Sequence, residues 1–308
     1  MKRMIIDCDP GHDDAIALIL AHSHAEVLGI TTVAGNTSID NTTANALGIC
    51  ELLGVGTQVY RGASKPLRRE STYAHAVHGE SGLGDVELPR HSRTESTISA
   101  VEYLLENVDT DVWVVPIGPL TNIAQVIQED PDWGSRIAGL SIMGGSTTVG
   151  NVTAVAEFNI SHDPEAADIV WRSGIPIKMC GLNLTHQLIA DDSIVACLRE
   201  ANPSNSELKT LATFAADCYD NILAAIENLR GQRQAALHDL CAVLALTHPD
   251  LFRFEDRHVA VETTGTHTSG MTVVDERFSP GKTANTEVAY EIDSDRAMSI
   301  VLGAFGAE

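Results

Sequence analysis

The sequence predicts an α/β fold in which a mostly parallel central sheet is flanked by helices, followed by a more helical C-terminal half. Two observations support this prediction. Short apolar, β-branched runs alternate with segments of helical periodicity as far as Cys180, which is the pattern of a parallel sheet covered on both faces. Hydrophobic residues make up 44% of the 308-residue chain, a proportion typical of a globular protein with a sizeable core.

The alternation defines the expected elements. The strand predicted at 5–8 runs into a Pro-Gly turn, and a helix at 13–21 follows it. The alternation stops between Arg61 and Arg93, where a long loop indicates a functional or mobile segment. Further strands are expected at 27–34, 111–116, 137–143, 176–180, 259–262, 271–274 and 287–292, and further helices at 41–53, 120–127, 164–172, 193–200, 206–229, 238–246 and from 295 onward.

The chain shows no linker, internal repeat or low-complexity tract, so we expect a single domain over residues 1–308. No apolar run approaches the ~20 residues that span a bilayer. The basic start at Lys2 and Arg3 precedes too short an apolar stretch for a signal peptide. We therefore expect a cytoplasmic protein. The six cysteines are scattered without a C-x-x-C pair, which makes a zinc site or disulfide framework improbable.

The net charge of −22, from 42 acidic and 20 basic residues, bears on the class of partner. Such a surface repels nucleic acid, anionic membranes and, less decisively, phosphorylated metabolites. It does not disfavour a neutral small molecule. We therefore expect neither a nucleic-acid nor a membrane partner.

Four carboxylates lie within eight residues near the N-terminus, at Asp7, Asp9, Asp13 and Asp14. Aspartates are rarely buried unless they are paired or coordinate a metal ion, and this cluster joins a buried strand to a helix. A hard cation is the simplest physical reason to hold so much negative charge in a small volume. The alternative is a solvated loop with ordinary helix-capping aspartates, although a cap needs only one.

Polar or Gly-rich turns follow four of the predicted strands. Ligands of open α/β sheets bind at the carboxyl ends of strands, so these turns predict one site. Asp239 begins an apolar helix and, alone, would be a simple cap. Together with the N-terminal aspartates it offers the distant carboxylate that an oxygen-only Ca²⁺ site needs. The turns are at Asp9, at Gly35-Asn36, at 117–122, and at 143–145 with Asn151, Glu157 and Asn159 shortly after.

The segment Asp7-Cys8-Asp9-Pro10-Gly11-His12-Asp13-Asp14 resembles the N-terminal signature of the nucleoside hydrolases, the inosine-uridine-preferring family of N-ribosyl hydrolases. Six further blocks keep the order of that family, and all seven span residues 5 to about 245. A single block would be a weak signal, whereas seven in order are specific. The further blocks are Val33-Ala34-Gly35-Asn36, His78-Gly79-Glu80-Ser81-Gly82, Gly118-Pro119-Leu120-Thr121-Asn122, Met143-Gly144-Gly145, Gly150-Asn151 with Ala156-Glu157-Phe158-Asn159 and Asp163-Pro164-Glu165-Ala166-Ala167, and His238-Asp239.

This resemblance implies a Rossmann-like α/β fold, a homodimer or homotetramer, and one Ca²⁺ per subunit. Matched by position, Asp9, Asp14 and Asp239 would be the carboxylate ligands of Ca²⁺. The backbone carbonyl of Ile117 would be another ligand; the family often has threonine there, but a backbone ligand tolerates the change. The ribose would be held by Asp13, Asn36, Met143, Asn151, Glu157 and Asn159.

The chemistry of these residues suits hydrolysis of a ribonucleoside to free base and ribose. Ribose is neutral and rich in hydroxyl groups, for which carboxylates and amides are suitable partners. Ca²⁺ would bind a water and make it easier to deprotonate, with Asp9 placed as general base. A ring of carboxylates would stabilise an oxocarbenium-like transition state more than the neutral substrate.

Two histidines would lie near the base, according to the same resemblance. His238 would protonate the leaving base or merely order the start of its helix, and both readings stay open. His78 would close over the base from the long loop. The family varies over residues 219–233, so no base contact is assigned there, and the choice between purine and pyrimidine stays open.

Two other functions compete with this interpretation. A haloacid-dehalogenase-like phosphatase also carries Asp-x-Asp after its first strand, but its motif needs Thr or Val where Gly11 stands. A non-catalytic protein that binds sugars or nucleosides would share the fold. The intact Asp9 argues against it, because binding alone requires no general base.

Overall fold

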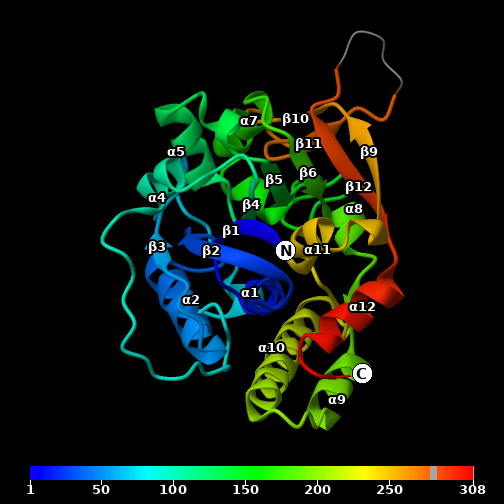
Figure 1. The fold of residues 1–308 in the computed structure, drawn as a ribbon. Helices are drawn as coiled ribbons and strands as arrows, with labels where there is room; N and C mark the ends of the chain where they lie inside the picture. The colour runs from blue at the N-terminus through cyan, green and yellow to red at the C-terminus, as the bar shows by residue number, and fades with distance from the viewer. Residues whose placement is uncertain (278–282, 308) are drawn as a thin grey trace.

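The computed structural model describes residues 1–277 and 283–307, and an eight-stranded sheet runs through its centre (Figure 1). All neighbouring strands pair in parallel except the last two, which confirms the predicted mostly parallel sheet. In sheet order the strands are β3 (Val59–Arg61), β2 (Ala25–Thr32), β1 (Lys2–Cys8), β4 (Val112–Pro116), β5 (Gly139–Met143), β6 (Ile177–Cys180), β12 (Thr286–Ile292) and β9 (Phe252–Arg257).

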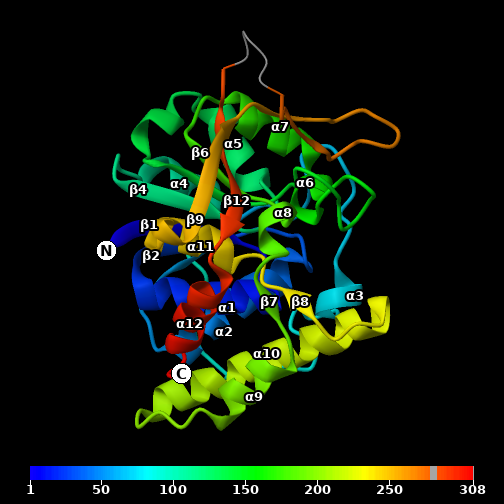
Figure 2. The ribbon, with the colours of Figure 1, turned by 90° about the vertical axis from the view of Figure 1, so that its right-hand side faces the viewer.

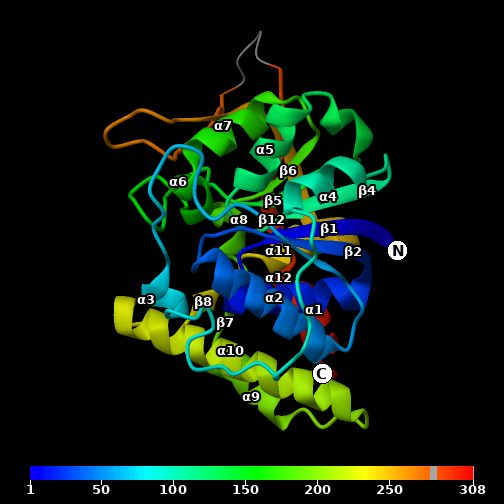
Figure 3. The same ribbon diagram turned by 90° about the vertical axis from the view of Figure 1, so that its left-hand side faces the viewer.

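Both faces of the sheet are covered, and strand β1 shows why its sequence is apolar throughout. Met4, Ile6 and Cys8 belong to one hydrophobic core and Ile5 to the other, because successive side chains of a strand point to opposite faces. The buried run therefore stabilises two helical layers at once (Figures 2 and 3).

The first layer contains the larger hydrophobic core and combines the first two helices of the chain with the helices of the C-terminal half. Within the described residues, no helix combines the length and apolar character needed to cross a bilayer. The helices of this layer are α1 (His12–His24), α2 (Ile39–Leu53), α9 (Asp192–Glu200), α10 (Ser206–Arg230), α11 (Leu240–Thr247) and α12 (Ser294–Gly303), and those of the second are α4 (Ala100–Glu106), α5 (Thr121–Glu129) and α7 (Pro164–Arg172).

Several shorter elements lie outside the central sheet. The strands predicted at 259–262 and 271–274 are present, and they pair with each other as a separate two-stranded sheet. The long loop after Arg61 contains a one-turn helix, α3 (His75–His78), which packs against α10. The remaining elements are α6 (Phe158–His162), α8 (Leu182–Thr185), β7 (Ile189–Ala190), β8 (Ala235–Ala236), β10 (Val259–Val261), β11 (Thr272–Val274), and the 3-10 turns Trp133–Arg136 and Pro249–Leu251.

Candidate active site

The site lies at the carboxyl ends of β1, β2, β4 and β5, which are neighbours in the sheet. Strand order reverses between β1 and β4, because β2 and β3 continue to one side of β1 and β5 and β6 to the other. Such a reversal opens a crevice in doubly wound sheets, and ligands bind there. The four turns that the sequence indicates therefore meet in one place.

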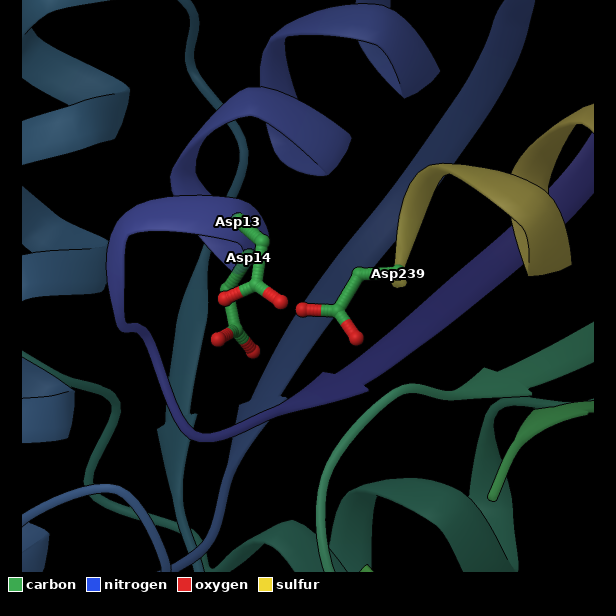
Figure 4. A group of neighbouring side chains, drawn as sticks. All are labelled: Asp13, Asp14 and Asp239. Carbon is green, nitrogen blue, oxygen red and sulfur yellow. The ribbon is translucent and has the colours of Figure 1, made fainter. Parts of the chain in front are cut away.

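Three carboxylates form the centre of this site. Oxygen atoms of Asp13, Asp14 and Asp239 all lie within 4.8 Å of one another. Asp13 and Asp14 come from the first turn of α1, and Asp239 comes from the N-terminus of α11 and points toward them (Figure 4). Asp14 is held by two backbone N–H groups, since Gly11 and Asp9 donate to it over 2.9 and 3.1 Å. The group thus includes Asp13, which the sequence assigns to ribose.

Asp9 lies beside this group of three carboxylates, enclosed by backbone. Its Oδ2 accepts a hydrogen bond of 2.6 Å from the Asn36 N–H. Its Oδ1 is buried without a hydrogen-bond partner among the described residues. A Cβ atom on Gly35 would lie 2.1 Å from Oδ2, and one on Gly118 would lie 2.5 Å from Oδ1. Only glycine at these two positions lets the backbone approach the carboxylate so closely.

The pKa values of Asp9, Asp14 and Asp239 are all raised above those of exposed aspartates. Burial raises the pKa of Asp14 to about 7, and the charge of Asp13 adds to this effect. Burial is also the main reason why the pKa values of Asp9 and Asp239 lie well above the usual range, with neighbouring carboxylates second. A divalent cation would favour the ionised forms. The donor set consists of oxygen atoms only, and the Oδ1 atoms of Asp9 and Asp13 have no hydrogen-bond partner in the described part of the chain. Both features fit a hard cation such as Ca²⁺.

A network around Asn159 connects the strand ends. Its side-chain N–H group donates to the carbonyl oxygens of Ile117 and Met143 over 2.9 and 3.1 Å. Glu157 caps α6, and its carboxylate accepts from the N–H groups of Gly145, Asn159 and Ile160. Burial raises the pKa of Glu157 to about 7. The Ile117 carbonyl oxygen keeps a second lone pair with which to bind a cation.

A cavity of about 480 Å³ opens above these groups. Asp9 and Asp14 are not among the described residues that line it; they are buried next to lining residues, Asp9 against Asn36 and Asp14 in the carboxylate group. Asp7 does not line the cavity either. Its Oδ1 accepts hydrogen bonds from Thr31 and Asn122 over 2.6 and 2.7 Å. The predicted site residues that line the cavity are Asp13, Asn36, His78, Ile117, Met143, Asn151, Glu157, Asn159, His238 and Asp239.

Both predicted histidines line the cavity and are electrically neutral near pH 7. Burial lowers the pKa of His78 to about 4. Burial also lowers the pKa of His238 to about 4, although the charge of Asp13 opposes the shift. The His238 Nδ1 lies 2.8 Å from the Thr185 hydroxyl oxygen, which fixes the ring.

The wall formed by α10 and the segment after it was not predicted from the sequence. Arg230 lines the cavity, whereas Arg233 forms ion pairs with Asp192 and Asp220 instead. The sequence did contain one indication of this wall. Ile222 and Ile226 are four residues apart, so they lie on the same face of the helix and form an apolar surface. The further lining residues are Thr72, Tyr73, Ala74, Val77, Val152, Phe158, His186, Ile189, Ile222, Ile226, Gln232, Gln234, Ala235 and Ala236.

Comparisons with known proteins agree with this geometry. Residues 4–299 match the family described as inosine-uridine preferring nucleoside hydrolase. The chain is 44% identical over 300 residues to the pyrimidine-specific ribonucleoside hydrolase RihA of Shewanella baltica, which covers 95% of this chain and 92% of that protein. It is 38% identical to the pyrimidine-specific ribonucleoside hydrolase RihB of Escherichia coli, with 96% and 94% covered.

A solved structure of a nucleoside hydrolase shows that the fold is shared as well. The purine-preferring ribonucleoside hydrolase from Gardnerella vaginalis has a TM-score of 0.90 to this chain at 33% identity, with 99% of each chain covered. The Rossmann-like fold implied by the sequence is thereby confirmed. The chain belongs to the inosine-uridine preferring nucleoside hydrolase family and is a hydrolase of N-glycosyl bonds.

Proposed function

We propose that this protein hydrolyses pyrimidine ribonucleosides to free base and ribose, and does so with bound Ca²⁺. The observation that carries the proposal is the group of Asp13, Asp14 and Asp239 at one end of the cavity, with the unpartnered Asp9 Oδ1 beside it. The pyrimidine preference is supported by the relatives RihA and RihB, which are more similar in sequence than the purine-preferring enzyme. Purine ribonucleosides are the alternative substrates.

Asp9, Asp14, Asp239 and the Ile117 carbonyl would hold the Ca²⁺ ion. When bound, Ca²⁺ would lower the pKa of a water molecule and so supply a nucleophile near neutral pH. The donor set supports Ca²⁺ over softer metals, because carboxylate and carbonyl oxygens suit hard cations.

The residues of the chain perform the remaining steps. The free Oδ1 of Asp9 accepts the proton of the attacking water. Asp13, Glu157 and the amides of Asn36 and Asn159 bind the ribose hydroxyl groups, which are neutral donors and acceptors. As the glycosidic bond breaks, positive charge develops on the ribose ring, and the surrounding carboxylates stabilise it. Met143 and Asn151 complete the ribose subsite.

Since His238 is neutral near pH 7, we propose that its N–H donates a hydrogen bond to the departing base, which leaves as the anion and takes its proton from water. His238→Ala should reduce kcat for uridine by about 100-fold, while kcat for nitrophenyl riboside, whose leaving group is already a stable anion, should change little. Steady-state kinetics on both substrates measures the difference. An equal loss on both would mean that His238 only orders the start of α11.

The substrate class is tested with a panel of inosine, adenosine, uridine and cytidine. We expect ribose release to be fastest from uridine and cytidine, and to stop when a calcium chelator is added and resume with excess Ca²⁺. A phosphomonoester serves as the matched negative substrate. Release of phosphate without cleavage of nucleosides would favour the phosphatase, and binding of uridine without ribose release over hours would favour the non-catalytic protein.

We also propose a single domain located in the cytoplasm, as the sequence indicates, and a homodimer or homotetramer, as the resemblance implies.

A further inference from the structure

Two buried histidines contact each other at the edge of the cavity. His12, in the first turn of α1, is 2% exposed, and His78, at the end of α3, is 7% exposed. Their rings stack with centroids 5.4 Å apart, and their Nδ1 atoms are 3.2 Å apart. His78 lines the cavity, whereas His12 lies behind it. The proposed chemistry assigns His12 no role.

The backbone decides where the protons of this pair lie. The His12 backbone N–H donates to the His78 Nδ1 over 3.3 Å, so that nitrogen presents a lone pair and carries no proton. The His12 Nδ1 faces the same lone pair and must therefore carry a proton, because two lone pairs would repel each other. The His78 Nδ1 thus accepts two hydrogen bonds, and its ring proton lies on Nε2.

The remaining nitrogen atoms lie as follows. The His12 Nε2 is buried and forms no hydrogen bond of normal geometry with the described residues. The backbone of Leu83 nonetheless acts on the His12 ring and partly offsets the lowering of its pKa by burial. The His78 Nε2 lies 4.0 Å from the Asp13 Oδ1, at the end of the cavity that holds the carboxylate group. That Asp13 oxygen is also buried without a partner within the described part of the chain.

Glycine at position 11 makes the contact possible. A Cβ atom there would lie 2.6 Å from the His78 Nδ1 and 2.8 Å from the Asn36 Nδ2. The turn before α1 therefore leaves room for the His78 ring against the backbone. The Pro-Gly turn that positions the aspartates also positions this histidine.

We propose that His12 is a positioning residue that holds His78 in the Nε2–H form, so that the base subsite presents a neutral hydrogen-bond donor. The donor would bond to an acceptor two bonds from the glycosidic nitrogen, which the O2 oxygen of uracil or cytosine and the N3 nitrogen of a purine both supply. This contact with the base rests on the function proposed above; the proton position does not.

Neutron diffraction from crystals of the deuterated full-length protein tests the proton position without any substrate. We expect deuterium on the His78 Nε2 and the His12 Nδ1, and none on the His78 Nδ1. Deuterium on the His78 Nδ1 would overturn the proposal. This result is independent of activity, so it stands even if the protein releases no ribose from any nucleoside.

Two variants of His12 test whether its hydrogen bond to His78 affects catalysis. His12→Asn keeps an N–H donor near the position of Nδ1, whereas His12→Leu removes it with similar volume. His12→Leu should lower kcat/KM for uridine about tenfold to a hundredfold, leave nitrophenyl riboside within about threefold, and leave Ca²⁺ affinity unchanged by calorimetry. His12→Asn should retain most of the activity on uridine. Equal losses in both variants, or equal losses on both substrates, would contradict the positioning role.

Discussion

Replacing Asp9 with asparagine is expected to reduce kcat by about 10³-fold while the protein still binds Ca²⁺ and ribose. The Asn36 N–H must still find an acceptor at the Oδ2 position, so the amide oxygen of the variant stays there. The amide nitrogen then occupies the unpartnered Oδ1 position, where it has no lone pair for a proton. Single-turnover kinetics with uridine, together with calcium titration calorimetry, measures the two effects separately.

Asp7→Asn provides the matched control for this experiment. Asp7 is equally buried and lies two residues earlier, on β1, and its Oδ1 already accepts from Thr31 and Asn122. An asparagine there keeps both hydrogen bonds and leaves the cavity unchanged, so kcat should stay within about threefold. Full activity of Asp9→Asn would remove Asp9 as the general base. Loss of Ca²⁺ binding in that variant would show that Asp9 acts through the metal.

Replacing Asp239 with alanine is expected to weaken Ca²⁺ binding by at least about 100-fold, because charge count sets the affinity of carboxylate sites. Asp239 is 3% exposed and points at Asp13 and Asp14 (Figure 4), so little else can take its place. Without Ca²⁺ the variant should be the more stable protein, since one of three mutually repelling carboxylates, and one of the two that are fully buried, is gone. Calorimetry gives the affinity, and thermal unfolding with and without Ca²⁺ gives the stabilisation.

An exposed aspartate serves as the control for Asp239. Asp256 lies on the edge strand β9, away from the cavity, and Asp256→Ala should bind Ca²⁺ as the unaltered protein does. Asp239→Asn keeps the size of the side chain and removes its charge, so it separates packing from electrostatics. A Ca²⁺ affinity that is unaltered in Asp239→Ala would exclude Asp239 as a ligand.

Parts of the structure escaped prediction for identifiable reasons. Strand β9 was not predicted, although Phe252 and Phe254 alternate with charged residues, a period of two that fits an exposed edge strand. The cavity wall of Ile222, Ile226 and Arg230 depends on how α10 docks against α1 and α3. Helical periodicity shows which side of a helix is apolar, but not whether that side faces a core or a ligand.

The sequence by itself determined the alternation of strands and helices and the concentration of ligand-binding residues at the strand ends. Both are local properties, since side-chain periodicity and turn residues act within a few positions. It also placed Asp9, Asp13 and Asp14 in one turn. Only the tertiary structure decided which of these aspartates meet Asp239, which carboxylate oxygens lack a hydrogen-bond partner among the described residues, and how His12 contacts His78 across 66 residues of chain. Those outcomes depend on the packing of α1 against α11 and of α3 against α10, where a shift of one ångström would separate the groups.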